Sequence, residues 1–338
     1  MATRIGINGF GRIGRNFFRA AKQRGADIEF VAANDLGSVE LMAHLLKFDS
    51  ILGTWDADIE VVGDGIKVNG DTLQILAERD PKALPWSDLG VDVVVESTGF
   101  FTERSKAAMH LEAGAPIVVI SAPGKDADAT FVVGVNDDTF DPDKHKVISN
   151  ASCTTNCFVP MVKVLDDAFG VEKGLMTTVH AYTGTQALVD GPASKDLREA
   201  RAAAINVIPS STGAARATAL VLESMKGKLD GQALRVPVPD GSITDFTAIL
   251  GRDVTVQDVN AAFRSASESG PLSKVLVYSE KPLVSSDIVG TPASCTFDAP
   301  LTMALGSLVK VMGWYDNEWG YSNRLVDLVE IVDAKRKR

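Results

Sequence analysis

Cysteine is scarce in this chain of 338 residues, which contains only three. Two of the three lie in one short segment, so they cannot form the paired disulfide framework of a small secreted protein, and a reducing, cytoplasmic location is expected. Long apolar runs are also missing, because no segment approaches the roughly 18 apolar residues of a membrane span. Residues 1–8 contain no apolar stretch of signal-peptide length. We therefore expect neither membrane insertion nor export directed by a signal peptide.

The chain also has no excess of basic residues. Its 34 Lys and Arg residues against 44 Asp and Glu residues leave a formal net charge of -10, which repels polyanions and argues against nucleic-acid binding as the main function. The basic residues 335–338 are interpreted as a solvated chain end. No repeat or low-complexity linker is present, and 45% hydrophobic and 23% charged residues are typical of a globular protein. The length suits two domains.

The first half of the chain alternates short apolar runs with helical patterns. The runs at residues 4–8, 28–34, 91–96 and 116–121 predict parallel strands joined by crossover helices. A Gly- and Asp-punctuated stretch at 58–76 predicts additional hairpin strands that decorate this core. The first half is therefore expected to be an α/β domain with a doubly wound parallel sheet.

The pattern changes after residue 150, where strands follow one another with fewer helices between them. Residues 174–182, 234–238, 242–250, 274–278 and 307–314 all have strand patterns. Several are too close in sequence for a crossover helix, so a mostly antiparallel or mixed sheet is expected, giving an α+β second domain. Residues 322–333 have the apolar spacing of a helix.

A glycine-rich motif follows the first predicted strand. Gly9, Gly11 and Gly14 form a G-x-G-x-x-G run that opens a helix, where backbone amides can approach a pyrophosphate. Asp35 ends the second strand, about 20 residues later, where a carboxylate would bind the adenosine ribose hydroxyls. This combination predicts a Rossmann-type domain that binds NAD in preference to NADP, since the carboxylate would repel a ribose phosphate. Arg79 and Ser121 are weaker candidates for the same site.

The segment 151–157 holds two of the cysteines. Cys153 comes directly after a strand and at the start of an apolar helical pattern, where free amides are expected to lower the pKa of a thiol and to hold an oxyanion. Cys157 and Cys295 fit buried, unreactive positions. His180 ends the predicted strand 175–179 and is the candidate base for Cys153.

A thiolate with an imidazole supports either acyl hydrolysis or addition to an aldehyde followed by hydride removal. The dinucleotide motif favours addition to an aldehyde followed by hydride removal, because a bound dinucleotide can accept the hydride. Attack by Cys153 would give a hemithioacetal, from which His180 removes the hydroxyl proton as hydride leaves, and a thioester would remain. These two residues do not specify which acceptor cleaves the thioester, and no metal site is expected.

Four long motifs, at residues 7–15, 149–156, 211–215 and 314–321, occur in this order along the chain. Together they resemble phosphorylating glyceraldehyde-3-phosphate dehydrogenases over nearly the whole length. The resemblance implies oxidation of glyceraldehyde 3-phosphate with NAD and inorganic phosphate to 1,3-bisphosphoglycerate, and a homotetramer. It also implies an NAD-binding domain at 1–152, a catalytic domain at 153–318, and a final helix at 319–338 that packs back on the first domain.

The same resemblance assigns roles residue by residue. Cys153 would be the nucleophile and His180 the base. Around NAD it places Arg12, Ile13, Asp35, Arg79, Ser121 and Asn317, next to the glycines already named. To the substrate phosphate and the attacking phosphate it assigns Ser152, Thr154, Thr183, Thr212, Gly213 and Arg235, whose hydroxyls, amides and guanidinium suit oxyanions.

Two positions depart from many relatives. Residues 190–204 resemble the family's long loop near a neighbouring subunit's cofactor, and the resemblance assigns Arg198 of this loop to phosphate binding. Glu199 follows Arg198 where two adjacent arginines are common, and an inward carboxylate would weaken anion binding. Gly37, two residues after Asp35, keeps some NADP use open.

Two alternatives to a phosphorylating glyceraldehyde-3-phosphate dehydrogenase remain. They are an erythrose-4-phosphate dehydrogenase, with water as the final acceptor, and a non-catalytic binding protein on the same fold.

Overall fold

The computed structural model describes residues 2–192 and 196–337, which divide into two compact units. The first unit contains residues up to 131, residues 137–151 and residues from 322 onward, and the second contains 132–136 and 152–321. These bounds differ slightly from the sequence-based ones. Residue 152 and the first turn of the last helix belong to the second unit, as does the short segment 132–136.

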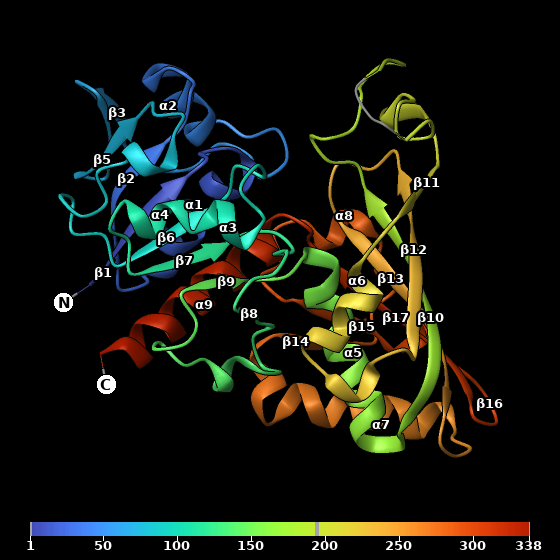
Figure 1. Cartoon of the computed structure of the whole chain (residues 1–338). Helices are drawn as coiled ribbons and strands as arrows, with labels where there is room; N and C mark the ends of the chain where they lie inside the picture. The colour runs from blue at the N-terminus through green and yellow to red at the C-terminus, as the bar shows by residue number, and fades with distance from the viewer. Residues whose placement is uncertain (1, 193–195, 338) are drawn as a thin grey trace. The chain divides into compact units, whose positions relative to one another are not determined.

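The first unit is built on one large sheet (Figure 1). Its strands are β1 (Thr3–Asn8), β2 (Ile28–Asn34), β3 (Ile59–Val62), β4 (Gly65–Val68), β5 (Asp71–Leu76), β6 (Val93–Glu96), β7 (Ile117–Ile120), β8 (Ala129–Thr130) and β9 (Val147–Ser149). They lie in the order β3-β4-β5-β2-β1-β6-β7-β9-β8. The four predicted core strands are present and parallel. The predicted hairpins are β3, β4 and β5, and β5 joins the core sheet parallel to β2.

Helices complete this unit and place the glycine motif at a strand-to-helix turn. They are α1 (Arg12–Arg24), α2 (Val39–Lys47), α3 (Arg104–Ala107), α4 (Met109–Glu112) and most of α9 (Trp319–Arg336). Helix α1 ends at Gly25, whose left-handed φ of 63° is the usual glycine stop for a helix. Arg24 then bonds Asn323 and Asp327, so that α1 and α9 lie side by side.

The second unit has a mixed sheet with the path β11-β12-β10-β13-β17-β15-β14, and β16 pairs with β17. The strands are β10 (Val171–Ala181), β11 (Ile208–Ser211), β12 (Leu229–Val236), β13 (Ser242–Leu250), β14 (Leu276–Ser279), β15 (Cys295–Asp298), β16 (Met303–Leu305) and β17 (Leu308–Tyr315). The five predicted strands are present, whereas β11, β15 and β16 were not predicted. Two pairs, β10 with β12 and β14 with β15, are parallel.

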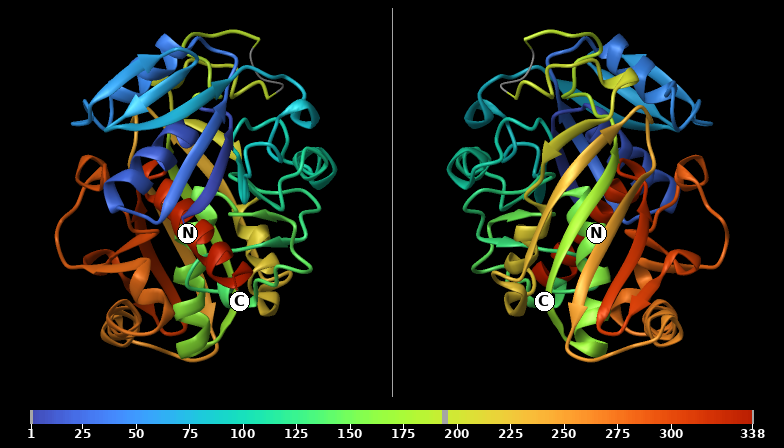
Figure 2. Two further views of the ribbon diagram at one scale, coloured as in Figure 1. Left: turned by 90° about the vertical axis from the view of Figure 1, so that its left-hand side faces the viewer. Right: turned by 90° about the vertical axis from the view of Figure 1, so that its right-hand side faces the viewer.

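Helices of the second unit cover one face of its sheet. They are α5 (Cys153–Phe169), α6 (Ala214–Ala217), α7 (Val256–Glu268) and α8 (Ser285–Ile288), with α5 against β13 and β17. Residues of β13 alternate between buried and partly exposed, as expected when only one sheet face is covered. In the right-hand view of Figure 2, β10, β12, β13 and β17 face the viewer with no helix in front of them in the described chain. None of the helices in residues 2–192 and 196–337 has the length and apolar character needed to cross a membrane.

Candidate active site

The glycine motif of the first unit forms a tight turn after β1. Gly9 has a left-handed φ of 93°, and a Cβ atom there would lie 2.6 Å from the backbone nitrogen of Thr98. A Cβ at Gly14 would lie 2.2 Å from the Gly9 carbonyl oxygen, so this glycine allows α1 to approach the turn closely. Gly11 has nothing within 4 Å of the same position. The turn therefore leaves open space at Gly11, which suits the approach of a pyrophosphate to the start of α1.

A cavity of about 380 Å³ adjoins this turn. It is lined by Asn8, Gly9, Gly11, Asn34, Asp35, Leu36, Glu78, Arg79, Ser97, Thr98, Phe100 and Phe101. The carboxylate of Asp35 accepts the backbone N–H of Phe10 at 2.9 Å and that of Gly37 at 3.2 Å, which holds it at the cavity. Apolar walls with a few fixed polar groups are typical of a site for a small organic ligand. The cavity and the turn fit the adenosine and pyrophosphate parts of NAD.

Of the other predicted NAD residues of this unit, Arg79 lines the cavity, whereas Arg12, Ile13 and Ser121 are not among the lining residues. Arg79 is exposed. Arg12 begins α1 and forms an ion pair with Asp49 at 2.9 Å. Ile13 follows it in the first turn, and Ser121 follows β7 with its N–H donated to the Glu96 carbonyl.

In the second unit, Cys153 is the first residue of α5, as the sequence predicts. The hydroxyl of Ser152 caps this helix by accepting the N–H of Thr155 at 3.0 Å. Ala151, before the cap, has a left-handed φ of 55°, which is uncommon for a residue with a side chain and is found at functional sites. The cap and the turn place the Cys153 sulfur beside the free amides of the first helical turn.

Strands β10 and β12 bring two further side chains to the Cys153 sulfur. The Nε2 atom of His180 lies 3.4 Å from the Sγ atom of Cys153. His180 pairs in register with Arg235 on β12, and Nη1 of Arg235 lies 2.7 Å from Nδ1 of His180. Arg235 can only donate, so it bonds Nδ1 when the proton of the imidazole is on Nε2. In the other tautomer, which leaves Nε2 free to act as a base, Nδ1 and Arg235 both donate to the Ala181 carbonyl oxygen, at 2.7 Å and 3.2 Å.

Burial and the nearby Arg235 cation leave His180 and Cys153 uncharged in the resting site. Burial, and then the Arg235 cation, lowers the pKa of His180 to about 3, so the imidazole is uncharged near neutral pH. Burial raises the pKa of the Cys153 thiol, while Arg235 and hydrogen bonds from Thr154 lower it. The expectation that the helix amides produce a net lowering was therefore wrong. They act in the predicted direction, but the loss of hydration around the sulfur is the larger effect.

Tyr315, at the end of β17, is a residue of the site that the sequence reasoning did not assign. Its hydroxyl lies 2.9 Å from the Thr154 hydroxyl and 2.8 Å from the Thr178 hydroxyl, and its ring stands edge-on to His180 at 5.9 Å between centroids. The three hydroxyls join α5, β10 and β17 behind the Cys153 sulfur. Tyr315 belongs to the motif at 314–321, but its partners depend on the sheet order and not on local sequence.

Asn317 is held in one orientation next to the same strands. The Ser242 hydroxyl accepts the N–H of Ala181 at 3.0 Å and donates to Oδ1 of Asn317 at 2.7 Å. Because Oδ1 accepts this bond, the amide nitrogen of Asn317 points away from Ser242. Asn317 thus presents its N–H groups in a set direction, which suits recognition of a carboxamide.

The remaining predicted residues lie on loops of the second unit. The hydroxyls of Thr183 and Thr185 lie 3.1 Å apart, Thr212 accepts the N–H of Ala214 at 3.2 Å, and Gly213 precedes α6. Arg198 is exposed. The Glu199 carboxylate accepts the hydroxyl of Ser210. Residues 193–195 of the predicted loop lie outside the described residues.

Both parts of the chain match one family. Residues 152–317 match the family described as "Glyceraldehyde 3-phosphate dehydrogenase, C-terminal domain", and residues 3–104 match "Glyceraldehyde 3-phosphate dehydrogenase, NAD binding domain". The chain belongs to the glyceraldehyde-3-phosphate dehydrogenase family. A glyceraldehyde-3-phosphate dehydrogenase of Streptomyces coelicolor is 61% identical over 333 residues, covering 98% of this chain and 99% of the relative. One of Mycolicibacterium smegmatis is 58% identical over 339 residues, with the same two coverages of 98% and 99%.

Membership of the glyceraldehyde-3-phosphate dehydrogenase family confirms several predictions made from the sequence. They are the family itself, the pairing of an α/β domain with an α+β domain, the enzyme class and NAD as the cofactor. Within the described residues, no group of three or more His, Cys, Asp or Glu side chains could hold a metal ion.

Proposed function

We propose that this chain catalyses the phosphorylating oxidation of D-glyceraldehyde 3-phosphate to 1,3-bisphosphoglycerate, with NAD and inorganic phosphate, in glycolysis and gluconeogenesis. The observation that carries the proposal is the 3.4 Å separation of Cys153 Sγ and His180 Nε2 at the start of α5, in a chain of this family. A thiol and a neutral imidazole at this distance can exchange a proton.

Each step moves a proton between these two side chains or their adducts. The Cys153 thiol gives its proton to His180 Nε2 as the sulfur adds to the aldehyde carbon, and the imidazolium returns this proton to the resulting oxyanion, which gives a hemithioacetal and a neutral His180. NAD, when bound, supplies the acceptor for the hydride. His180 removes the hydroxyl proton as the hydride leaves, so that a thioester remains on Cys153. Attack by a phosphate oxygen on the thioester carbon releases the acyl phosphate and the Cys153 thiolate, which takes the proton held by His180 and so restores the thiol.

The chain's own donors suggest how the two phosphate groups are held. Arg235 supplies a guanidinium beside His180, and Thr183, Thr212, Gly213 and Arg198 supply hydroxyls, amides and a second cation on nearby loops. The hydroxyls of Ser152 and Thr154 are bonded within the protein. We therefore assign these two residues to anion binding through their backbone amides at the start of α5. The bond from Ser210 gives the Glu199 carboxylate a partner within the second unit, which reduces its effect on a phosphate.

One assay tests substrate, acceptor and nucleophile together. NADH formation from glyceraldehyde 3-phosphate is expected to require added inorganic phosphate for repeated turnover. Phosphate-independent turnover would instead support the erythrose-4-phosphate dehydrogenase alternative. Cys153→Ala is expected to abolish turnover while NAD still binds, because the glycine turn and the nucleophile lie in separate units. Full turnover by this variant would refute the mechanism, and absence of turnover by the wild type would favour the non-catalytic alternative.

We also infer that the protein is a cytoplasmic homotetramer. Its three cysteines are free in the structure, which suits a reducing compartment. The uncovered face of the second sheet exposes apolar side chains, among them Leu175 at 69% and Leu305 at 75% exposure. Contiguous exposed apolar surface is a common sign of a protein interface. Sedimentation velocity is expected to give about four times the mass of one chain, and a monomer at micromolar concentration would contradict this inference.

A further inference from the structure

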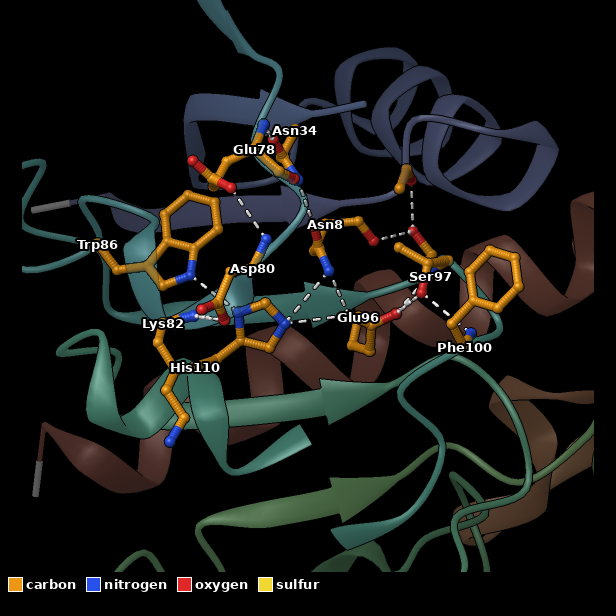
Figure 3. A network of polar contacts seen from close by, with 12 residues as sticks. Asn8, Asn34, Glu78, Asp80, Lys82, Trp86, Glu96, Ser97, Phe100 and His110 are labelled. Atoms are coloured by element: carbon orange, nitrogen blue, oxygen red, sulfur yellow. Dashed lines mark hydrogen bonds and ion pairs between the residues drawn. The ribbon is translucent and has the colours of Figure 1, made fainter. Parts of the chain in front are cut away.

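A chain of buried hydrogen bonds begins at His110, behind the cavity of the first unit (Figure 3). His110 is completely buried, as is Trp86, whose indole N–H donates to Nδ1 of His110 at 3.0 Å. An indole nitrogen can only donate, so Nδ1 accepts and carries no proton. The neutral imidazole therefore holds its proton on Nε2, which lies 3.0 Å from Oε2 of Glu96 and donates to it. The amide nitrogen of Asn8 lies 3.3 Å from Nε2, but both nitrogens then carry protons, so each donates to Glu96 and not to the other. Trp86 thus selects one tautomer of His110.

Glu96 receives this bond and three others. Its Oε2 also accepts the side-chain amide of Asn8 at 2.6 Å, and its Oε1 accepts the N–H of Thr98 at 2.8 Å and the Thr98 hydroxyl at 2.5 Å. A carboxylate that is 2% exposed requires such donors, because an unsatisfied buried charge is costly. The four donors come from three separate segments of the first unit, and Glu96 holds them together.

The direction of each later bond follows from the first. Because the amide nitrogen of Asn8 donates to Glu96, its Oδ1 is left to accept the amide of Asn34 at 2.7 Å. Asn34 in turn donates to the Glu78 carbonyl at 2.8 Å and accepts the Glu78 N–H at 2.7 Å. Reversing either asparagine would place donor against donor. The orientation of every group from His110 to Glu78 is therefore coupled.

This chain of bonds ends at the residues that carry the cavity wall. Asn8, Asn34 and Glu78 line the cavity and directly precede Gly9, Asp35 and Arg79, which also line it. Ser97 and Thr98 follow Glu96 and form another part of the wall. His110 is not among the residues lining this described cavity. It can influence a bound dinucleotide through the bonds that it makes and through its edge-on ring contact with Phe101 of the cavity wall, at 6.4 Å between centroids.

We propose that His110 is a positioning residue for NAD binding. Held by Trp86 with its proton on Nε2, it orients Glu96, and through Glu96 the asparagines that set the glycine turn and the Asp35 carboxylate. The inference rests on the proposed function only in taking NAD as the ligand of this cavity. A shift of the wall by a fraction of an ångström weakens several ligand contacts together, so the effect should appear in NAD affinity and not in the chemical step.

Two substitutions at His110 separate positioning from packing. His110→Leu removes both the acceptor for Trp86 and the donor for Glu96, whereas His110→Gln retains one acceptor and one donor. The dissociation constant for NAD, measured by titration of the full-length protein, should rise roughly tenfold in His110→Leu, which corresponds to about 1.4 kcal/mol. His110→Gln should recover part of this loss. The kcat at saturating NAD and the KM for glyceraldehyde 3-phosphate should stay within about twofold of the wild type.

Control variants keep the test decisive. His44→Leu changes an exposed histidine of α2 and should leave NAD affinity unchanged. If His110→Leu does not fold, Trp86→Phe removes the bond that selects the tautomer, together with part of a buried ring, keeps the donor from His110 to Glu96, and should weaken NAD binding by a smaller factor. Unchanged NAD affinity in folded His110→Leu would overturn the inference while leaving the proposed function intact. If Trp86→Phe is used in its place, unchanged NAD affinity in that folded variant has the same meaning. Failure of the wild type to bind NAD would refute both.

Discussion

Replacing His180 by asparagine is a direct test of the proton transfer on which the chemistry depends. The substitution removes the imidazole nitrogen that lies 3.4 Å from the Cys153 sulfur and leaves no group there that accepts a proton near neutral pH. An asparagine amide can still donate to the Ala181 carbonyl, which His180 contacts at 2.7 Å. The side chain is only 4% exposed, so the smaller residue also leaves a small cavity. We expect the fold to survive with reduced stability.

The expected loss of rate follows from the state of the thiol. A positioned general base contributes about 10² to 10⁴ in rate, or about 2.7 to 5.4 kcal/mol at 1.36 kcal/mol per factor of ten. Burial raises the pKa of Cys153, so few thiolates form without a neighbouring base. The same base is needed again when the hemithioacetal loses its proton. Both considerations place the expected decrease in the upper half of the range, about 10³ to 10⁴.

Rapid mixing of the NAD-loaded protein with glyceraldehyde 3-phosphate measures this step as the first turnover of NADH. NAD affinity should be unchanged in His180→Asn, since the described cavity for the dinucleotide is formed by the other unit. His145→Asn, which alters a partly exposed histidine outside the site, is the matched control and should retain the wild-type rate. A first turnover within about threefold of the wild type in folded His180→Asn would refute the role of His180 as base.

Two further predictions concern carboxylates. Burial, and then the negative charges of Asp316 and Glu318, raises the pKa of Asp240 to about 8, so the folded chain retains a proton that the unfolded chain releases above about pH 4. The stability that this group contributes is thus lost as pH rises from about 4 to about 8. Over this interval the thermal midpoint of Asp240→Asn should fall less than that of the wild type. Parallel plots of thermal midpoint against pH for the two proteins would contradict the assignment. Asp35→Ala should relax discrimination against NADP, because the carboxylate that would repel a 2′-phosphate is removed, and an unchanged ratio of kcat/KM values for the two cofactors would show that Asp35 does not set the preference.

Local sequence was sufficient for much of the fold. The predicted strands at 28–34 and 242–250 are β2 and β13 with the same bounds. Each run is of strand length and has the apolar pattern of a strand. The start of α5 was predictable as well, because Cys153 comes directly after a strand and begins the apolar helical pattern within one short segment. Strand β15 was not predicted. Its residues 295–298 are all buried, and so short a run carries little periodic signal.

The order of the strands could not be read in the same way. β5 was expected as part of a decorating hairpin, but it pairs parallel to β2 at residues 32–34 and extends the core sheet. That pairing depends on which sheet edge is available once the chain has folded. The same limitation applies to Tyr315, whose hydroxyl meets Thr154 across 161 positions of sequence.

The sequence by itself determined the chemical identity of the groups: a glycine turn, an acidic strand end, a thiol at a helix start and a histidine at a strand end. Each is recognisable because its neighbours in the chain create its local geometry. Only the tertiary structure decided the protonation of those groups. Removal from water raises the pKa of the partly buried Cys153 thiol and lowers that of the buried His180 imidazole, whereas the Arg235 cation that β12 brings alongside lowers both. Hydration and charge act through space, so they depend on residues that are distant in the chain.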